Sequence, residues 1–129
     1  RFDDEPLSCN ESGPIKMKGF DVFSFVATDV SRFLKDFLVS LDNSSLFTLH
    51  SSLLFVPHQA NPYMVRQLAK SLGLSERLLT LDESKKNPGS CSIPMTLAAH
   101  PECRGKRVLL AGFGAGYSAA AAVVKMGKM

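Results

Sequence analysis

The stretch VPHQAN, residues 56–61, is the part of this sequence from which the fold can be worked out. An apolar strand predicted over Leu53–Pro57 ends just before His58 and Asn61, and a helix predicted over Pro62–Leu72 begins at once. In alternating α/β folds, side chains at the carboxyl end of a strand are held rigidly beside a cleft, where such folds place their chemistry. The stretch therefore predicts an α/β fold with a site at this strand end.

Two further motifs lie downstream of this stretch. Asn87 stands in KNPGS, residues 86–90, and a predicted strand end carries the glycine-rich run GFGAG, residues 112–116. Taken alone, Asn-Pro-Gly is a sequence typical of turns. A single histidine is more often structural than catalytic. A histidine, an asparagine and a glycine loop in this order together indicate a site that stabilises negative charge on an oxygen.

The elements predicted around these motifs alternate as β-α-β-α-β-α-β-β. This order predicts a five-stranded mixed sheet with helices on both faces, the first two helices on one face and the third on the other. The predicted strands are Ile15–Lys18, Leu53–Pro57, Leu78–Leu81, Arg107–Phe113 and Tyr117–Met126; the helices are Phe20–Leu41, Pro62–Leu72 (stopped by Gly73) and Gly89–Ala99, with a helical turn at Phe47–Leu49 and a tail or linker over residues 1–14.

Length and composition fit one domain or a piece of one. The chain has 129 residues, 45% of them hydrophobic, and begins at Arg1, so we expect an excised or processed piece. A net charge of +3 with scattered basic residues gives no reason to expect a nucleic-acid partner. The longest purely apolar run is Ala119–Val124, too short for a membrane helix, and residues 1–5 lack a signal-peptide core.

The chain has three cysteines, Cys9, Cys91 and Cys103, and no Cys-x-x-Cys motif, which predicts a reducing cytoplasm and not a disulfide framework. A zinc site through Cys91, His100 and Cys103 lacks a fourth ligand and a standard spacing, so no metal is expected. The remaining candidates are interpreted as structural or packing residues: His50, His100, Ser90, Cys91 and Ser92.

The glycine-rich run 112–116 has three interpretations. A dinucleotide-binding loop needs a third glycine where Tyr117 stands and an acidic residue about 20 positions further on, so this interpretation is disfavoured. A tight strand–turn–strand connection needs glycine only for its dihedral angles. An oxyanion hole would instead turn a backbone N–H toward the cleft. The last two interpretations stay open.

Taken together, the three motifs resemble the C-terminal half of β-ketoacyl-acyl-carrier-protein synthase III, in the thiolase-like superfamily. That family carries V-P-H-Q-A-N, then G-N-T-S-A-A-S-I-P, then G-F-G-G-G. This chain has VPHQAN at 56–61, KNPGSCSIP at 86–94 and GFGAG at 112–116. The resemblance spans roughly Ile15–Met126.

The resemblance implies half of a larger fold and part of an active site. The family stacks two similar halves as α-β-α-β-α layers, and residues 15–129 would be the C-terminal half-domain. The family nucleophile is a cysteine at a helix N-terminus in the other half, and no cysteine of this chain matches its position. The helix Gly89–Ala99 is central in the family, so without the other half we expect this chain to form a homodimer through that face.

The family transfers an acyl group from coenzyme A to its cysteine, decarboxylates malonyl-acyl-carrier-protein and joins the two by Claisen condensation, in fatty acid or related polyketide biosynthesis. By resemblance, the side chains of His58 and Asn87 are two N–H donors to the thioester oxygen during decarboxylation. Ala115 aligns with the glycine whose backbone N–H completes the hole for the acyl-cysteine. A coenzyme A thioester is a substrate, and no cofactor is implied.

The resemblance also implies residues that bind the acyl carrier or coenzyme A. These are Gln59, Asn61, Tyr63, Arg66 and Lys70. Tyr63 stands where the family often has an arginine that helps dock the acidic carrier. Arg66 and Lys70 lie one and two turns further along the predicted helix and are the expected substitutes.

The second motif departs from the family at both neighbours of Asn87. Lys86 replaces a glycine and Pro88 a threonine, and proline restricts Asn87 to extended dihedral angles. The alternative function is that of a non-catalytic relative, a partner subunit or binding domain that kept the fold and lost the cysteine. Retention of both His58 and Asn87 favours the enzyme, because a purely structural relative has no need of two convergent donors.

Overall fold

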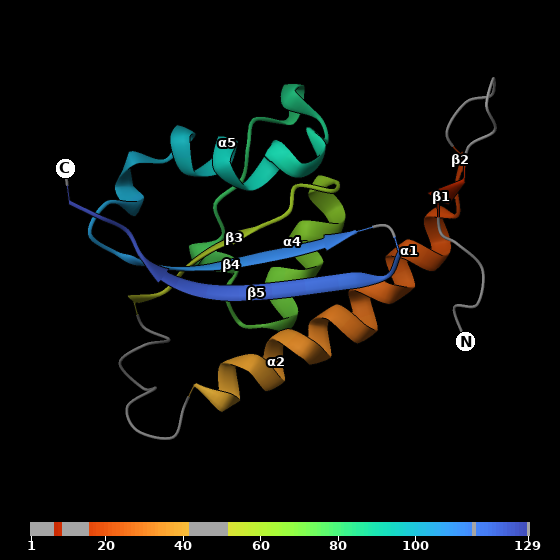
Figure 1. Ribbon diagram of the computed structural model, residues 1–129, viewed down its shortest axis with the longest axis horizontal. Coiled ribbons are helices and arrows are strands. Elements are labelled where there is room, and N and C mark those ends of the chain that lie inside the picture. The colour runs from red at the N-terminus through yellow and green to blue at the C-terminus, as the bar shows by residue number, and fades with distance from the viewer. Residues whose placement is uncertain (1–6, 9–15, 42–51, 115, 129) are drawn as a thin grey trace.

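A three-stranded mixed sheet forms the centre of the structure (Figure 1). Strand β3 (Leu54–Pro57) pairs in parallel with β4 (Arg107–Gly114), and β4 pairs antiparallel with β5 (Ser118–Lys125). Pro57, the last residue of β3, lies opposite Ala111, so β3 ends well before β4 does. The computed structural model describes residues 7–8, 16–41, 52–114 and 116–128.

Helices cover both faces of this sheet, as the sequence predicts (Figure 1). Alternate side chains of β4 enter two separate apolar clusters because successive residues of a strand point to opposite faces. Leu109 and Phe113 pack with the long N-terminal helix and α4, whereas Val108 and Leu110 pack with α5. The helices are α1 (Gly19–Phe25), η1 (Val26–Val30), α2 (Ser31–Ser40), α4 (Pro62–Ser71) and α5 (Ser92–Ala99).

The predicted helix Phe20–Leu41 is present as one continuous helical run whose middle, η1, is a π-helix. Its buried residues Val26, Val30, Leu34 and Leu38 recur every four positions. An α-helix has 3.6 residues per turn, so a strict spacing of four drifts around its surface. The wider π turn offsets part of this drift and keeps the four side chains against the sheet.

Helix α4 begins and ends at the residues that the sequence singles out. The Asn61 side chain accepts a hydrogen bond from the Met64 N–H at 2.8 Å, and Pro62 occupies the first helical position, where its missing N–H costs nothing. Gly73 follows the helix with φ of 68°, the left-handed conformation that glycine adopts without strain. The first motif thus leads directly from β3 into a capped helix.

The predicted five-stranded sheet is wrong, because the described residues form three strands in the central sheet. Lys16–Met17 (β2) pairs with Leu7–Ser8 (β1) in a separate two-stranded ladder. Leu78 makes only an isolated bridge to Phe55, so the predicted strand Leu78–Leu81 does not form. Two side chains take the backbone groups that a longer ladder would need: His100 bonds the Thr80 carbonyl, and Gln59 bonds the Leu81 N–H.

The other boundaries differ from prediction by a few residues. The predicted helix Gly89–Ala99 begins as a 3₁₀ turn, η4 (Gly89–Cys91), before α5 starts at Ser92. The predicted turn Phe47–Leu49 and most of the predicted tail over residues 1–14 lie outside the described residues. Within the described ranges, no helix is both long enough and apolar enough to span a membrane.

Candidate active site

His58 lies one residue beyond the end of β3. Its backbone N–H donates to the Ala111 carbonyl at 2.8 Å, which continues the β3–β4 pairing and fixes the main chain. Its ring meets the edge of Phe113 with the centroids 5.4 Å apart and an interplanar angle of 80°. The strand ladder and an aromatic contact therefore hold this imidazole in one place.

The two nitrogens of the His58 ring have different surroundings. Nδ1 lies 2.7 Å from the Ser92 hydroxyl oxygen on the first turn of α5. Nε2 has no hydrogen-bond partner among the residues that the structure describes. Burial lowers the pKa of the His58 imidazole below its ordinary value, because desolvation disfavours the charged ring. The ring is therefore neutral at physiological pH.

Asn87 bonds to its own loop through its amide oxygen. Its Oδ1 accepts a hydrogen bond from the Gly89 N–H at 2.9 Å. A backbone N–H can only donate, so the amide atom facing it must be the oxygen. The Nδ2 amino group is thereby left as a donor, and it has no partner within the described part of the chain.

His58 and Asn87 line the same cavity, although they come from different strand–helix connections. This cavity has a volume of about 330 Å³. Its wall also includes Met64 of α4 and Phe113 of β4, so much of it is apolar. A second hollow of about 460 Å³ adjoins His58 on the side of α5 and β5. A mostly apolar cavity lined by an imidazole and amide side chains can hold an oxygen that gains negative charge during a reaction, if these groups donate N–H bonds to it.

The loop that carries Asn87 is strained at the residue before it. Lys86 has φ of 52° and ψ of −145°, a conformation that is close to glycine-only territory. The resemblance places a glycine at this position, and the observed backbone gives the physical reason for that preference. The loop keeps a glycine-like path although a lysine occupies it.

Lys86→Gly should therefore stabilise the chain. Relief of the strained backbone is worth about 1–3 kcal/mol, and the extra freedom of glycine in the unfolded state offsets about 0.5–1 kcal/mol of that. Urea unfolding should show a net gain of about 1 kcal/mol. Lys85→Gly, at the end of the short helix η3 (Glu83–Lys85), is the matched control and should lower stability. Equal effects of the two substitutions would argue against strain at Lys86.

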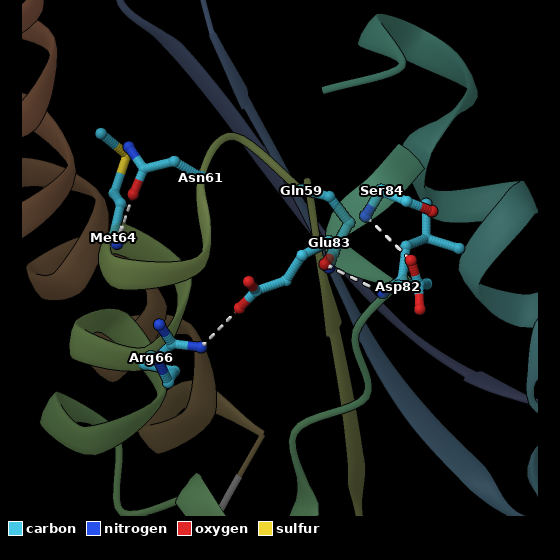
Figure 2. A network of polar contacts seen from close by, with 8 residues as sticks. Gln59, Asn61, Met64, Arg66, Asp82, Glu83 and Ser84 are labelled. Atoms are coloured by element: carbon cyan, nitrogen blue, oxygen red, sulfur yellow. Dashed lines mark hydrogen bonds and ion pairs between the residues drawn. The ribbon is translucent and has the colours of Figure 1, made fainter. Parts of the chain in front are cut away.

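Two residues predicted to bind the acyl carrier or coenzyme A are engaged in the protein's own backbone (Figure 2). The buried Gln59 amide donates to the Pro57 carbonyl at 2.8 Å and accepts from the Leu81 N–H at 3.2 Å. Asn61 caps α4 through its side-chain oxygen. These contacts tie β3, α4 and the Asn87 loop together, and a binding role for the two side chains stays a prediction.

The other three predicted binding residues lie on the exposed side of α4. Tyr63 stacks on Phe23 with centroids 6.0 Å apart, and Lys70 is exposed. Arg66 pairs with Glu83 at 3.5 Å (Figure 2), and because both side chains are well exposed this pair is weak. The spacing of three and four residues places these side chains on one helix face. Ala115, the predicted backbone donor, lies outside the described residues.

Sequence reasoning missed the part that Ser92 plays at the site. It was expected only to allow close packing, but its hydroxyl reaches the catalytic candidate His58. A signal was present in the sequence, because Ser92 and Thr96 are polar residues four positions apart, and so on one face, within an otherwise apolar helix. The structure buries both of them. A polar side chain that an apolar helix buries needs a hydrogen-bond partner, so a search for the partner of Ser92 would have led to His58.

His100 joins the Asn87 loop to the end of α5. Its Nε2 lies 2.8 Å from the Thr80 carbonyl and its Nδ1 2.7 Å from a Glu102 carboxylate oxygen. Both partners only accept, so both nitrogens donate when the ring is charged. The bond to the Thr80 carbonyl is the main cause that raises the pKa of His100, and Glu102 adds to it. These contacts leave no ring nitrogen for a metal ion.

The glycine-rich run belongs to β4 and to its connection with β5. Gly112 and Gly114 are in the strand, opposite Ala120 and Ser118. Gly116 and Tyr117 both have positive φ, 77° and 43°, as a tight antiparallel connection requires. The run therefore forms a strand–turn–strand connection, and β5, not a helix, follows it, whereas a dinucleotide loop would need a helix. The oxyanion-hole interpretation stays a prediction.

The arrangement of sheet, helices and strand-end histidine is that of a thiolase-like domain. The family model described as 3-oxoacyl-[acyl-carrier-protein (ACP)] synthase III C terminal matches residues 47–126. The chain belongs to this family, which confirms the resemblance seen in the three motifs.

Curated relatives agree with this assignment. The β-ketoacyl-[acyl-carrier-protein] synthase III of Clostridium tetani is 34% identical over 116 residues, which cover 86% of this chain and 34% of that protein. The protein of the same name from Acholeplasma laidlawii is 35% identical over 117 residues, covering 87% of this chain and 36% of its own length. The chain thus spans about a third of the length of these relatives.

Solved structures show the same fold over nearly the whole chain. The 3-oxoacyl-(acyl carrier protein) synthase III of Pseudomonas aeruginosa matches with a TM-score of 0.76 and 26% identity, over 96% of this chain and 40% of that one. The 3-oxoacyl-(acyl-carrier protein) synthase of Burkholderia xenovorans matches with a TM-score of 0.76 and 26% identity, over 91% and 34%. The described α/β unit therefore corresponds to part of a larger fold.

Proposed function

We propose that this chain supplies the oxyanion-stabilising part of a decarboxylating condensing enzyme of the synthase III type. The observation that carries the proposal is the cavity lined by both His58 and Asn87, whose Nε2 and Nδ2 atoms have no hydrogen-bond partner among the described residues. The reaction is the Claisen condensation of an acyl-coenzyme A with malonyl-acyl-carrier-protein, as used in fatty acid or related polyketide biosynthesis.

The decarboxylation step needs hydrogen-bond donors and not a strong acid or base. Loss of carbon dioxide from the malonyl thioester leaves an enolate, with negative charge on the thioester oxygen. A neutral imidazole N–H and an amide N–H stabilise that charge without transferring a proton. The lowered pKa of His58 keeps its ring neutral, and the apolar wall formed by Met64 and Phe113 strengthens both hydrogen bonds by excluding water.

The nucleophilic cysteine comes from the other half of the enzyme. The family nucleophile lies at a helix N-terminus in the other half, and no cysteine of this chain matches that position. Of the described cysteines, Cys103 is also buried, which raises the pKa of its thiol and disfavours the thiolate. The acyl-enzyme therefore forms on a residue that this chain does not contain. The backbone N–H of Ala115 is proposed to complete the hole for the acyl-cysteine carbonyl.

The other half of the fold covers the outer face of α5. Exposed residues of this segment include Cys91, Met95 and Ala98, which are four and three positions apart and so share one helix face. Small and apolar side chains on an exposed helix face favour close packing against a second helix. When the other half is absent, a second copy of this chain is the proposed occupant of the same face.

The acyl carrier protein is proposed to dock beside α4. Arg66 and Lys70 on its exposed side offer positive charge to an acidic carrier, and Tyr63 lies one turn closer to the cavity.

Two half-reactions test the proposed function. The intact enzyme that contains this chain should gain one acyl group on a cysteine from acetyl-coenzyme A, seen by mass spectrometry, and should then release carbon dioxide from malonyl-acyl-carrier-protein. The 129-residue chain alone should do neither, because it lacks the nucleophile. Acylation of the chain itself would mean that the cysteine has been misplaced. Absence of both half-reactions in the intact protein would favour a non-catalytic relative.

A further inference from the structure

The Ser92 hydroxyl is a buried polar group with one partner. The residue is 1% exposed at the start of α5, and its Oγ lies 2.7 Å from Nδ1 of His58. The hydroxyl has no other hydrogen bond within the described residues, while the Ser92 carbonyl accepts from the Thr96 hydroxyl at 2.8 Å. The contact joins residues 34 positions apart in the sequence, so it is a product of tertiary structure.

The direction of this hydrogen bond follows from what each atom can do. A serine hydroxyl has one hydrogen to donate, and leaving it without an acceptor in a buried site is costly. The only acceptor that the described structure offers is Nδ1 of His58. If Nδ1 carried the ring hydrogen instead, two donors would face one another unless the hydroxyl turned away to no partner. Donation from Ser92 to Nδ1 satisfies both groups.

We infer that Ser92 is a positioning residue that selects the Nε2–H tautomer of His58. With Nδ1 accepting from Ser92, a neutral ring must carry its hydrogen on Nε2, the nitrogen that no described protein group occupies. Nε2 is then a donor toward the cavity, as oxyanion stabilisation requires. The inference rests on the proposed function for its purpose, but the tautomer itself is a property of the chain that can be measured separately.

Nitrogen NMR of the chain tests the tautomer directly. Long-range proton–nitrogen correlation of the histidine rings is recorded at a pH above the ordinary histidine pKa, with His58 assigned by its loss in His58→Gln. We expect the wild-type Nδ1 of His58 to resonate as an unprotonated nitrogen and Nε2 as a protonated one. A wild-type ring with its hydrogen on Nδ1 overturns the inference, whatever the variants do.

Variants of Ser92 test whether this serine determines the tautomer of His58. Ser92→Ala should shift the ratio of the two tautomers by about fivefold to tenfold, the effect of losing one hydrogen bond. Ser92→Thr keeps the hydroxyl and should restore the wild-type pattern. Ser90→Ala removes an exposed serine from the neighbouring turn and should change nothing. An unchanged ratio in a folded Ser92→Ala chain, checked by circular dichroism, would overturn the inference.

Rates measured in the intact enzyme distinguish failure of this inference from failure of the proposed function. There Ser92→Ala should slow malonyl decarboxylation about fivefold to tenfold while acylation of the cysteine keeps its rate, and Ser92→Thr should recover the loss. An equal loss of both half-reactions would mean that Ser92 only supports the fold. If the wild-type enzyme releases no carbon dioxide, the proposed function fails, and the tautomer measured in the chain still stands or falls by itself.

Discussion

His58→Ala should lower the rate of malonyl decarboxylation about 10²–10³-fold in the enzyme that joins this chain to its nucleophile-bearing half. His58 and Asn87 are the two proposed side-chain donors that line the cavity, and neither His58 Nε2 nor Asn87 Nδ2 has a partner among the described residues. Removal of the imidazole leaves Asn87 as the single proposed side-chain donor. Charge on the thioester oxygen would then form in a largely apolar space with half of its stabilisation gone. Release of labelled carbon dioxide from malonyl-acyl-carrier-protein measures the loss.

The same variant carries its own control. Acylation of the cysteine by acetyl-coenzyme A does not develop the enolate that His58 stabilises, so that half-reaction should stay close to the wild-type rate. His58→Gln keeps a side-chain N–H donor and should recover part of the decarboxylation. Equal loss of both half-reactions would instead point to a structural role, through the contacts of His58 with Phe113 and Ser92.

The second large effect concerns self-association of the chain into a dimer. We expect the chain alone to form a two-fold dimer at micromolar concentration through the outer face of α5, and Met95→Glu to weaken that dimer about 30-fold or more. Met95 is 37% exposed on a helix whose buried residues are Ser92 and Thr96. A carboxylate at the centre of an apolar helix contact would be desolvated without a partner, which is strongly unfavourable.

Sedimentation velocity over a concentration series measures this weakening. The matched control is Val39→Glu, which puts the same charge on α2, where Val39 is 67% exposed. This control should leave the dimer unchanged if α5 is the contact face. A wild-type chain that stays monomeric and folded would contradict the proposed occupant of the α5 face. If the other half covers α5 in the intact enzyme, as proposed, Met95→Glu should there impair folding and not a self-association.

Local sequence signals were sufficient for most of the elements near the site. The apolar residues leading into VPHQAN indicated β3, and Pro62 and Gly73 indicated where α4 begins and ends, because start and stop signals act within a few residues of chain. Such signals failed for the predicted strand Leu78–Leu81. Backbone groups of this segment bond to the side chains of Gln59 and His100. The residues of the segment itself cannot show that side chains distant in the sequence will take its hydrogen-bonding groups.

The sequence by itself determined the class of fold, the family and the donor candidates His58 and Asn87, since those follow from short motifs in a fixed order. Tertiary structure decided how these residues are used. It brought His58 and Asn87 to one cavity and placed the Ser92 hydroxyl beside Nδ1 of His58. It also fixed the orientation of the Asn87 amide, because the Gly89 N–H donates to its oxygen. Hydrogen-bond direction depends on which donor meets which acceptor in space, so only the packed structure fixes it.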